Sequence, residues 1–288
     1  MIRRVVICGG AGFIGTALRR QLESSGYDVT VISRNPGEGQ LGWDQLSETL
    51  EGAFAVVNLA GRAINCVFTD QNKREILTSR VESTEKIAAA INQCLVKPKK
   101  WINASATGIY GDRGDEALNE SSPSGDGFLP EICTAWENSC LLSAAESKKV
   151  VIRIGVVLSS KGGILAKLIP YVKALLGGSA GHGNQWVSWI HLTDMVRLTQ
   201  HVIEHNTPSV VSGSTQNPVQ NRDLMSWLRG LYRRPWSPPV PAFILKLNGR
   251  LIGPDASLAL DSCRVISAQL PDFQFVFPSL ESIKRSDI

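Results

Sequence analysis

Residues 5–15, VVICGGAGFIG, place Gly9, Gly12 and Gly15 three positions apart behind an apolar run. The run predicts a short strand, and the residues that follow predict a helix from 13 to 25. In such a strand–turn–helix the first glycine permits the tight turn, the second lets backbone N–H groups approach a diphosphate, and the third lets the helix lie close to the strand. The helix N-terminus offers unpaired N–H groups and its positive dipole end to phosphate. The stretch therefore predicts a dinucleotide diphosphate site.

Around this turn, short β-branched runs alternate with segments of helical period through the first half of the chain. The runs are RRVVIC, DVTVIS, FAVVNLA, KWINAS and KVVIRIGVVL, with helices expected near residues 69–94 and 131–146. Such alternation is typical of a parallel sheet with helices on both faces. We therefore predict an α/β fold built on a doubly wound parallel sheet.

The pattern changes at residue 161, where a glycine-rich stretch precedes helices expected over 193–204 and 222–232. The segment RRPWSPPVP follows, and its prolines prevent regular structure. Beyond residue 242 we expect two or three helices and one strand, FQFVF. The predicted organisation is a dinucleotide-binding core over 1–160, the rest of the core with substrate-cleft loops over 161–237, and a small C-terminal α/β lobe over 238–288.

The net charge of +4 comes from scattered basic residues, which suits an anionic small ligand better than nucleic acid. The four-residue apolar run before Gly9 is too short for a signal peptide, and no later window approaches the roughly 20 apolar residues of a membrane span. We therefore expect a cytoplasmic protein without membrane contact. The six cysteines contain no C-x-x-C pair, so we expect reduced thiols and no metal site.

The end of the second predicted strand bears on the cofactor. NAD-binding folds usually carry an acidic residue there, which accepts hydrogen bonds from the adenosine ribose. This chain instead reads VISRN, with Ser33 and Arg34 at that position. A guanidinium matches a 2′-phosphate bidentately, so NADP(H) is favoured over NAD(H). The alternative is that Arg34 is a solvated surface residue.

Five motifs occur together in this chain: GGAGFIG, VVNLAG, ASATGIYGD, RIGVVLSSKGG and WIHLTDMV. In this order they resemble extended, atypical members of the short-chain dehydrogenase/reductase superfamily. The likeness is greatest to NAD-dependent epimerase/dehydratase-like proteins with a short extra C-terminal domain, and it covers essentially the whole chain. The resemblance implies a Rossmann-type fold and an NADP(H)-binding oxidoreductase or epimerase that acts on an unknown small molecule. The cofactor residues, from the glycine turn and from this resemblance together, are Gly9, Gly12, Phe13, Ile14, Gly15, Ser33, Arg34, Leu59, Ala60, Gly61, Glu75, Arg80 and Val157.

The superfamily usually moves a proton with a Ser or Thr and with a Tyr and a Lys arranged as Y-x-x-x-K on one helix. Ser105 matches the serine position, but the helix that should carry the pair reads FLPEICTAWENS. When its WE dipeptide is aligned with the glutamate that usually follows the lysine, Leu129 falls at the tyrosine position and Cys133 at the lysine position. Neither side chain can transfer the proton or supply the positive charge. Tyr110 is the nearest phenol and, with Ser105, the candidate catalytic group; packing of its ring is the alternative.

Other polar residues support weaker hypotheses. Glu120 is the closest carboxylate that can replace a base. His201 and His205 are one helical turn apart, yet no acidic ligand accompanies them, so we expect no metal. Thr193 is the expected N-cap of its helix, and His182 lies in the glycine-rich stretch, a candidate lid.

Three functions remain open from the sequence. The leading one is an NADP(H)-dependent enzyme. The second is a protein that binds the dinucleotide without turning it over and senses occupancy or redox state. The third, S-adenosylmethionine binding, lacks its usual carboxylate after the second strand. The sequence determines neither substrate nor oligomeric state.

Overall fold

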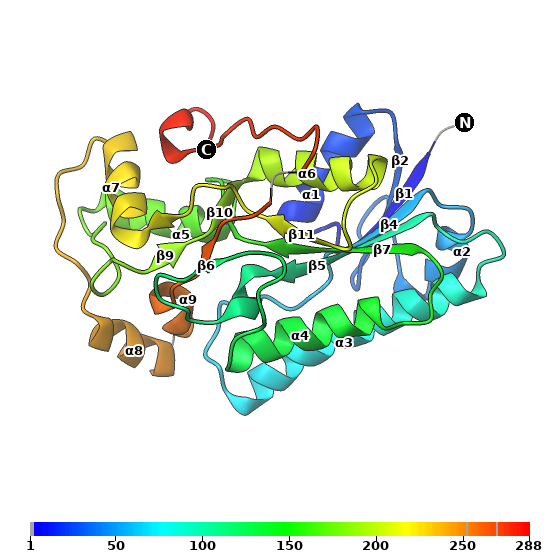
Figure 1. Ribbon diagram of the computed structural model, residues 1–288, viewed down its shortest axis with the longest axis horizontal. Coiled ribbons are helices and arrows are strands. Elements are labelled where there is room, and N and C mark those ends of the chain that lie inside the picture. Colours follow the sequence, from blue (N-terminus) through cyan, green and yellow to red (C-terminus); the bar gives the residue numbers. More distant parts are fainter. Residues whose placement is uncertain (1–2, 252, 269) are drawn as a thin grey trace.

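The computed structural model describes residues 3–251, 253–268 and 270–288. Its centre is a parallel sheet of seven strands with helices on both faces, which confirms the predicted fold class (Figure 1). In spatial order the strands are β11 (Val210–Gly213), β7 (Lys148–Ile154), β5 (Lys100–Ala106), β4 (Ala55–Asn58), β1 (Arg4–Cys8), β2 (Asp28–Ile32) and β3 (Gln40–Leu41). The order reverses at β1, so a crevice opens at the carboxyl ends of β1 and its neighbours, where such folds bind ligands.

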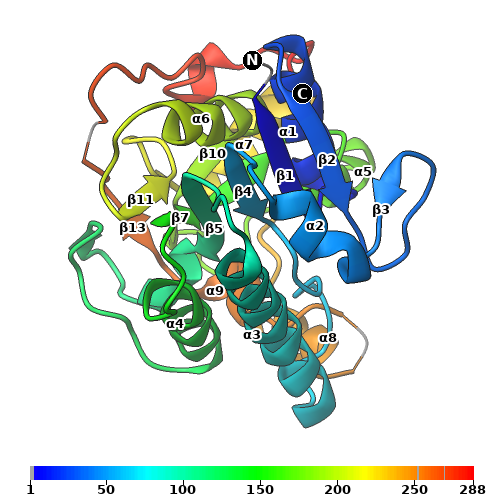
Figure 2. The ribbon, with the colours of Figure 1, turned by 90° about the vertical axis from the view of Figure 1, so that its right-hand side faces the viewer.

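Two layers of helices cover the sheet, as Figures 1 and 2 show. One face carries α1 (Phe13–Ser24) and α6 (Leu192–Glu204), and the other carries α2 (Leu46–Leu50), α3 (Asp70–Gln93) and α4 (Phe128–Leu141). Successive side chains of a strand point to opposite faces. Val5 and Ile7 of β1 accordingly join the core under α1 and α6, whereas Val6 and Cys8 join the core under α2 and α3.

α4 begins three residues earlier and ends five residues earlier than the range expected from the sequence. Gly127, with φ +102°, stands immediately before it. Pro130 then falls in the first turn, where its missing N–H removes no helical hydrogen bond. The proline therefore starts the helix rather than delaying it.

A second set of elements extends the core beyond β7. It comprises β8 (Val156–Leu158) paired with β10 (Trp189–His191), β9 (Trp186–Val187) paired with β12 (Val219–Gln220), α5 (Gly163–Lys173) and α7 (Asn221–Leu231). The expected N-cap of α6 was wrong. His191, not Thr193, caps the helix, because its Nδ1 accepts the Thr193 N–H at 3.2 Å.

The tail contains α8 (Ala242–Leu251), α9 (Ser257–Leu260) and β13 (Arg264–Val265), which pairs with β6 (Ala117–Leu118). The strand expected at FQFVF was wrong. Side chains in this segment alternate, with Phe273 buried and Gln274 exposed. Its backbone N–H groups, however, donate hydrogen bonds to a side chain instead of pairing with a neighbouring strand. The Asp194 carboxylate accepts the N–H groups of Val276 and Phe277, each at 2.8 Å. The tail thus contacts the core at β6 and at α6, and the predicted three-part division stays a prediction.

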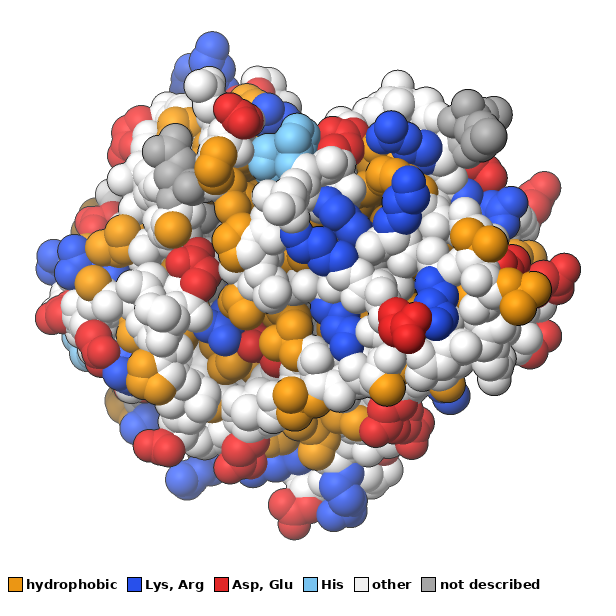
Figure 3. All heavy atoms as spheres, turned by 45° about the vertical axis from the view of Figure 1, so that its right-hand side comes forward, with side chains coloured by type: hydrophobic (Ala, Val, Ile, Leu, Met, Phe, Trp, Pro, Cys, Tyr) orange, Lys and Arg blue, Asp and Glu red, His pale blue; other side chains and the backbone are white. Residues whose placement is uncertain are grey.

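On the face in Figure 3, Lys and Arg side chains are interspersed with acidic and apolar ones. Within the described residues, no helix combines the length and the apolar character needed to cross a bilayer. All six cysteines are free, and Cys8, Cys94, Cys133 and Cys140 are buried.

Candidate functional site

The glycine turn has the geometry that its spacing predicted. Gly9 has φ +81°, and a Cβ there would lie 2.8 Å from the backbone nitrogen of Ala60. At Gly15 a Cβ would lie 2.6 Å from the Cα of Gly10, so only glycine lets α1 begin this close to the turn. Gly12 caps α1 without any side-chain hydrogen bond, which leaves the first N–H groups of the helix free for an anion.

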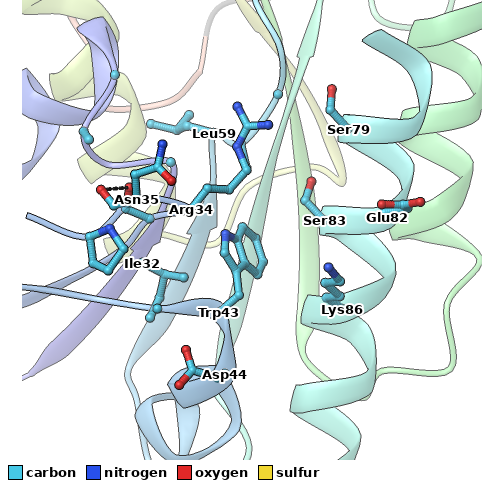
Figure 4. A pocket seen from close by; sticks show the side chains of 18 residues that line it. Ile32, Arg34, Asn35, Trp43, Asp44, Leu59, Ser79, Glu82, Ser83 and Lys86 are labelled. Carbon is cyan, nitrogen blue, oxygen red and sulfur yellow. Dashed lines mark hydrogen bonds between the residues drawn. The ribbon is translucent and has the colours of Figure 1, made fainter. Parts of the chain in front are cut away.

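A cavity of about 650 Å³ opens beside this turn. Its walls come from the carboxyl ends of β1, β2 and β4 and from one face of α3 (Figure 4). Arg34 and Trp43 extend across it, and Ser79 and Ser83 point toward them from α3. Ser33 donates a hydrogen bond to the backbone oxygen of Asn35 at 3.3 Å. Among the described residues, no carboxylate lies within ion-pair distance of Arg34, so its guanidinium can receive a phosphate.

The cavity brings together many residues that the sequence assigned to the cofactor, namely Gly9, Gly12, Ser33, Arg34, Leu59, Ala60 and Gly61. It also contains residues that the sequence reasoning missed: Ala11, Ile32, Asn35, Pro36, Gly42, Trp43, Asp44, Ser79, Glu82, Ser83 and Lys86. The last four recur at three- and four-residue intervals on α3. That spacing marks one helix face and was the available signal.

Several assigned residues lie outside this cavity's lining. Glu75 forms an ion pair with Arg62, with 2.5 Å between Oε2 and Nη1. Phe13 and Ile14 pack against the core, and Val157 belongs to it. Their roles at the cofactor remain predictions.

Arg80 lies just beyond the cavity wall. Its Nη1 donates to the backbone oxygens of Arg62 and Ile76, at 2.9 and 3.0 Å. Its guanidinium also lies over the ring of Trp136, 5.0 Å from the centroid. A Cβ at Gly61 would lie 3.1 Å from the guanidinium carbon, so Arg80 packs against the cavity-lining turn after β4. Its assignment to the cofactor also remains a prediction.

The superfamily's proton-relay position is formed by β5 and α4. Leu129 and Cys133 lie one turn apart on α4, and the Cys133 thiol adjoins the Ser105 hydroxyl and the backbone of Ala106. Burial, with a smaller contribution from Glu137, raises the pKa of the thiol to about 11. The thiol is therefore neutral at physiological pH and supplies no positive charge.

Ser105 and Tyr110 are joined by a buried ion pair that the sequence reasoning did not foresee. Glu137 and Arg153 form two parallel hydrogen bonds, both 2.9 Å long, with the two side chains only 6% and 10% exposed. Ser105 donates to Glu137 at 2.7 Å, and Arg153 donates to the Tyr110 hydroxyl at 2.9 Å.

The Tyr110 hydroxyl also donates to the backbone oxygen of Asn119 at 2.9 Å, so its hydrogen bonds are used inside the protein. Burial raises the pKa of Tyr110, and Arg153 opposes that rise. A fully buried phenol with these partners contributes to the packing of the protein interior. This geometry counts against Tyr110 as a proton donor to substrate, although the catalytic assignment of Ser105 and Tyr110 stays a prediction.

The weaker candidates are also placed. The carboxylate of Glu120 accepts the backbone N–H groups of Ser212 and Ala268, at 3.2 and 3.3 Å, so it links three segments. His201 and His205 stack with 4.1 Å between ring centroids. Within the described chain, no group of three or more His, Cys, Asp or Glu side chains is arranged to hold a metal.

A second cleft lies between the core and the tail. Two adjoining cavities, of about 310 and 600 Å³, share Asp255, Ser257 and Asp261. The smaller cavity reaches Leu129 on α4, and the larger one reaches His182 and α8. Burial, together with the neighbouring carboxylates of Asp112 and Asp255, raises the pKa of Asp261 to about 6.

Comparison with known proteins agrees with this architecture. Residues 5–213 match the family model described as the NAD dependent epimerase/dehydratase family. The human epimerase family protein SDR39U1 is 33% identical over 286 residues, which cover 96% of this chain and 97% of the human protein. An Arabidopsis thaliana chloroplastic homologue of SDR39U1 is 32% identical over 289 residues, covering 95% of this chain and 82% of that protein.

Two solved structures also match closely. The crystal structure of human SDR39U1 with NADPH superposes with a TM-score of 0.90 at 31% identity, covering 98% of each chain. A nucleoside-diphosphate sugar epimerase from Corynebacterium glutamicum gives a TM-score of 0.79 at 32% identity, covering 98% of this chain and 57% of that one. Together with the family model, these matches show that the chain belongs to the NAD-dependent epimerase/dehydratase family.

Proposed function

We propose that this protein binds NADP(H) in the cavity beside the glycine turn and uses it in an oxidation–reduction or an epimerisation of a small molecule. One observation carries the proposal: the N-terminus of α1, which has no side-chain cap, and the guanidinium of Arg34, which has no carboxylate partner among the described residues, line the same cavity of about 650 Å³. Two anion-binding groups in one cavity suit a ligand with a diphosphate and a separate phosphate. The crystal structure of the human relative with NADPH supports the choice of cofactor.

The residues present fit such a cofactor. The N–H groups at the start of α1 hold the diphosphate, and Gly9 permits the tight turn that lets the diphosphate approach the backbone. Arg34, with Ser33 and Asn35 beside it, holds the 2′-phosphate. Leu59 and Ala60 present backbone and apolar atoms to the adenosine. When bound, the nicotinamide supplies or accepts a hydride.

The substrate belongs in the cleft between the core and the tail, because this cleft adjoins Leu129 at the carboxyl end of the sheet. Its lining contains the carboxylates of Asp255 and Asp261 and the cations of Lys73, Lys246 and Arg250. Such a lining suits a polar small molecule.

Calorimetry with NADPH and NADH tests the cofactor assignment. We expect NADPH to bind at least about tenfold more tightly, because a bidentate guanidinium–phosphate contact contributes about 1.5–3 kcal/mol. Arg34→Ala should remove most of that preference and leave NADH affinity nearly unchanged. Arg74→Ala, at an exposed position of α3 outside the cavity lining, is the matched control and should change neither affinity. Equal affinities in the wild-type protein would contradict the 2′-phosphate assignment.

A second function, a dinucleotide-binding protein without turnover, is favoured by Leu129 and Cys133 at the relay positions. A redox sensor works only if the oxidised and reduced ligands have different affinities, because only differential binding shifts a conformational equilibrium. We therefore expect at least about tenfold different affinities for NADP⁺ and NADPH under this alternative. Similar affinities for the two forms exclude redox sensing.

A further inference from the structure

Large apolar side chains gather at one end of the molecule. Of the sixteen that are exposed among the described residues, nine belong to two segments, 164–176 and 236–251. The first segment includes most of α5, and its exposed members are Ile164, Tyr171, Leu175 and Leu176. The second begins with Trp236, which is 73% exposed, and continues through α8. Apolar side chains that are grouped at a surface mark a site of contact with a protein or a membrane, whereas scattered ones need no explanation.

The two segments lie side by side. Ser237 donates a side-chain hydrogen bond to the backbone oxygen of Leu175 at 2.9 Å, and Trp236 directly precedes this contact. The N–H of Val240 donates to the backbone oxygen of Ser179 at 2.8 Å, and α8 begins two residues later. In Figure 1, α5 and α8 accordingly lie at the same end of the molecule. The exposed apolar groups therefore belong to one surface.

The helix α8 has an apolar face that is directed away from the second cleft. Phe243, Leu247 and Leu251 recur at four-residue intervals, and each is more than half exposed. Residues one position earlier in each turn, among them Lys246, line the second cleft. The apolar face adjoins this cleft-lining face and is available to a partner outside the chain.

The same surface is basic. The chain contains 26 acidic residues in 288, yet none of them falls in 147–193 or in 224–254. The exposed cations beside the apolar groups are Lys167, Lys173, Arg233 and Arg234. Within the described residues, none of these four forms an ion pair. Arg285 adds a further cation, because its guanidinium carbon and the Lys173 nitrogen lie 4.8 and 5.3 Å from the centroid of the same ring, that of Tyr232. The charge of this surface complements an anionic partner.

We propose that this basic apolar surface, formed by the exposed side chains of residues 164–176 and 233–251, docks the protein on a membrane that contains anionic lipids. The headgroup region receives Trp236 and the apolar face of α8, and the cations pair with lipid phosphates. A bilayer accepts protruding side chains directly, whereas a protein partner needs a pocket for each anchor. A second copy of this chain is disfavoured, because two basic surfaces repel each other.

Such docking requires no spanning helix. It departs from the expectation of no membrane contact, which considered only segments that could cross a bilayer or serve as a signal peptide. Because α8 also lines the second cleft, docking through its apolar face places that cleft close to the membrane.

Co-sedimentation of the full chain with vesicles tests the proposal. We expect binding to phosphatidylcholine vesicles that contain phosphatidylglycerol and much weaker binding to phosphatidylcholine alone, with a decrease as salt screens the charges. Arg233→Gln combined with Arg234→Gln should weaken binding about 30-fold, since each basic residue near an anionic surface contributes about fivefold. Phe243→Gln combined with Leu247→Gln should weaken it at least about tenfold, because less apolar area leaves water.

The controls are a basic and an apolar residue that are exposed on other elements. Arg74→Gln on α3 and Leu142→Gln after α4, where Leu142 is 79% exposed, should bind vesicles as the wild type does. Losses at Leu142 equal to those of the Phe243 and Leu247 variant would place the contact elsewhere and overturn the inference. Thermal unfolding identifies a variant that does not fold, and the arginine pair, which lies outside any helix or strand, then decides alone.

Tryptophan emission provides a second test. All seven tryptophans lie in the described residues, and Trp236 is the only exposed one among them. Its emission should shift to the blue when anionic vesicles are added, because the ring enters the headgroup region. Trp236→Phe, which keeps an apolar ring, should lose the shift and retain most of the binding. A shift that persists in Trp236→Phe contradicts docking through this surface.

Wild-type protein that binds no anionic vesicles overturns the inference and makes an acidic protein the better candidate for this surface. The inference is independent of the proposed cofactor, so its failure does not affect the proposed function.

Discussion

Two regions at the carboxyl ends of the strands differ in how many of their polar groups already have hydrogen-bond partners within the protein. The glycine-turn corner comprises Gly9, Gly12 and Arg34, and the α4 corner comprises Ser105, Tyr110, Glu137 and Arg153. At the glycine turn, the α1 N-terminus has no side-chain cap, and Arg34 has no carboxylate partner among the described residues. At α4, Glu137 and Arg153 bond to each other and also engage Ser105 and Tyr110. Groups without protein partners are available to a ligand, whereas groups that satisfy one another hold the fold together. We therefore expect the first corner to bind the ligand and the second to stabilise the fold.

The largest expected effect concerns the buried ion pair of the α4 corner. Glu137→Gln leaves the Arg153 charge buried without a counter-charge and should destabilise the protein by about 3–5 kcal/mol in denaturant unfolding. The matched control is Glu116→Gln, which breaks another ion pair with two hydrogen bonds, Arg113–Glu116, where Glu116 is 50% exposed. That change should cost less than about 1 kcal/mol. Similar stabilities for the two variants would show that the α4 network does not hold the fold.

An intermediate effect is expected at the glycine turn. Gly9 and Gly26 have nearly the same positive φ, +81° and +84°, but a Cβ at Gly26 has no neighbour within 4 Å. Gly26→Ala should therefore cost only the backbone strain, about 1 kcal/mol, with NADPH affinity unchanged. Gly9→Ala adds the clash with Ala60, so we expect about 2–4 kcal/mol of destabilisation and a loss of NADPH binding. Unchanged NADPH affinity in Gly9→Ala would separate this turn from the cofactor.

The smallest expected effect is the pH dependence of stability that Asp261 causes at the second cleft. The pKa of Asp261 is about 6 in the folded protein against 3.8 ordinarily, so the folded state binds the proton more tightly. The Asp261 contribution to stability must therefore fall as pH rises from about 4 to about 6 and stay low above that range. Asp261→Asn should remove this decline and stabilise the protein at pH 7 by about 1 kcal/mol, after allowance for solvent screening. Thermal unfolding across this pH range measures the effect.

Asp126→Asn is the control for that measurement, because Asp126 lines the smaller cavity but is not one of the carboxylates that raise the pKa of Asp261. It should leave the pH dependence as in the wild type. If Asp261→Asn also leaves it unchanged, the carboxylates of the second cleft do not interact as the structure indicates.

The fold class and the geometry of the glycine-turn corner could be predicted from the sequence alone. Both depend on local patterns: strand and helix periods, and glycines at positions where any Cβ would collide with the neighbouring backbone. Gly9, Gly12 and Arg34 line one cavity, as expected from their places at a strand end or helix start, and their roles at the cofactor remain predictions. The loss of the Y-x-x-x-K pair was also visible, since Leu129 and Cys133 stand on one continuous helix.

The surroundings of Leu129 and Cys133, in contrast, are visible only in the folded chain. Glu137 and Arg153 are 16 residues apart and Arg80 is 53 positions before Cys133 (133 − 80), so no local period relates them. The strand expected at FQFVF failed for the same reason, because the Asp194 carboxylate, more than 80 residues away in sequence, takes its backbone N–H groups. Long-range partners of single polar side chains leave no periodic signal in the sequence, and in this protein they determine which polar groups remain free to bind a ligand.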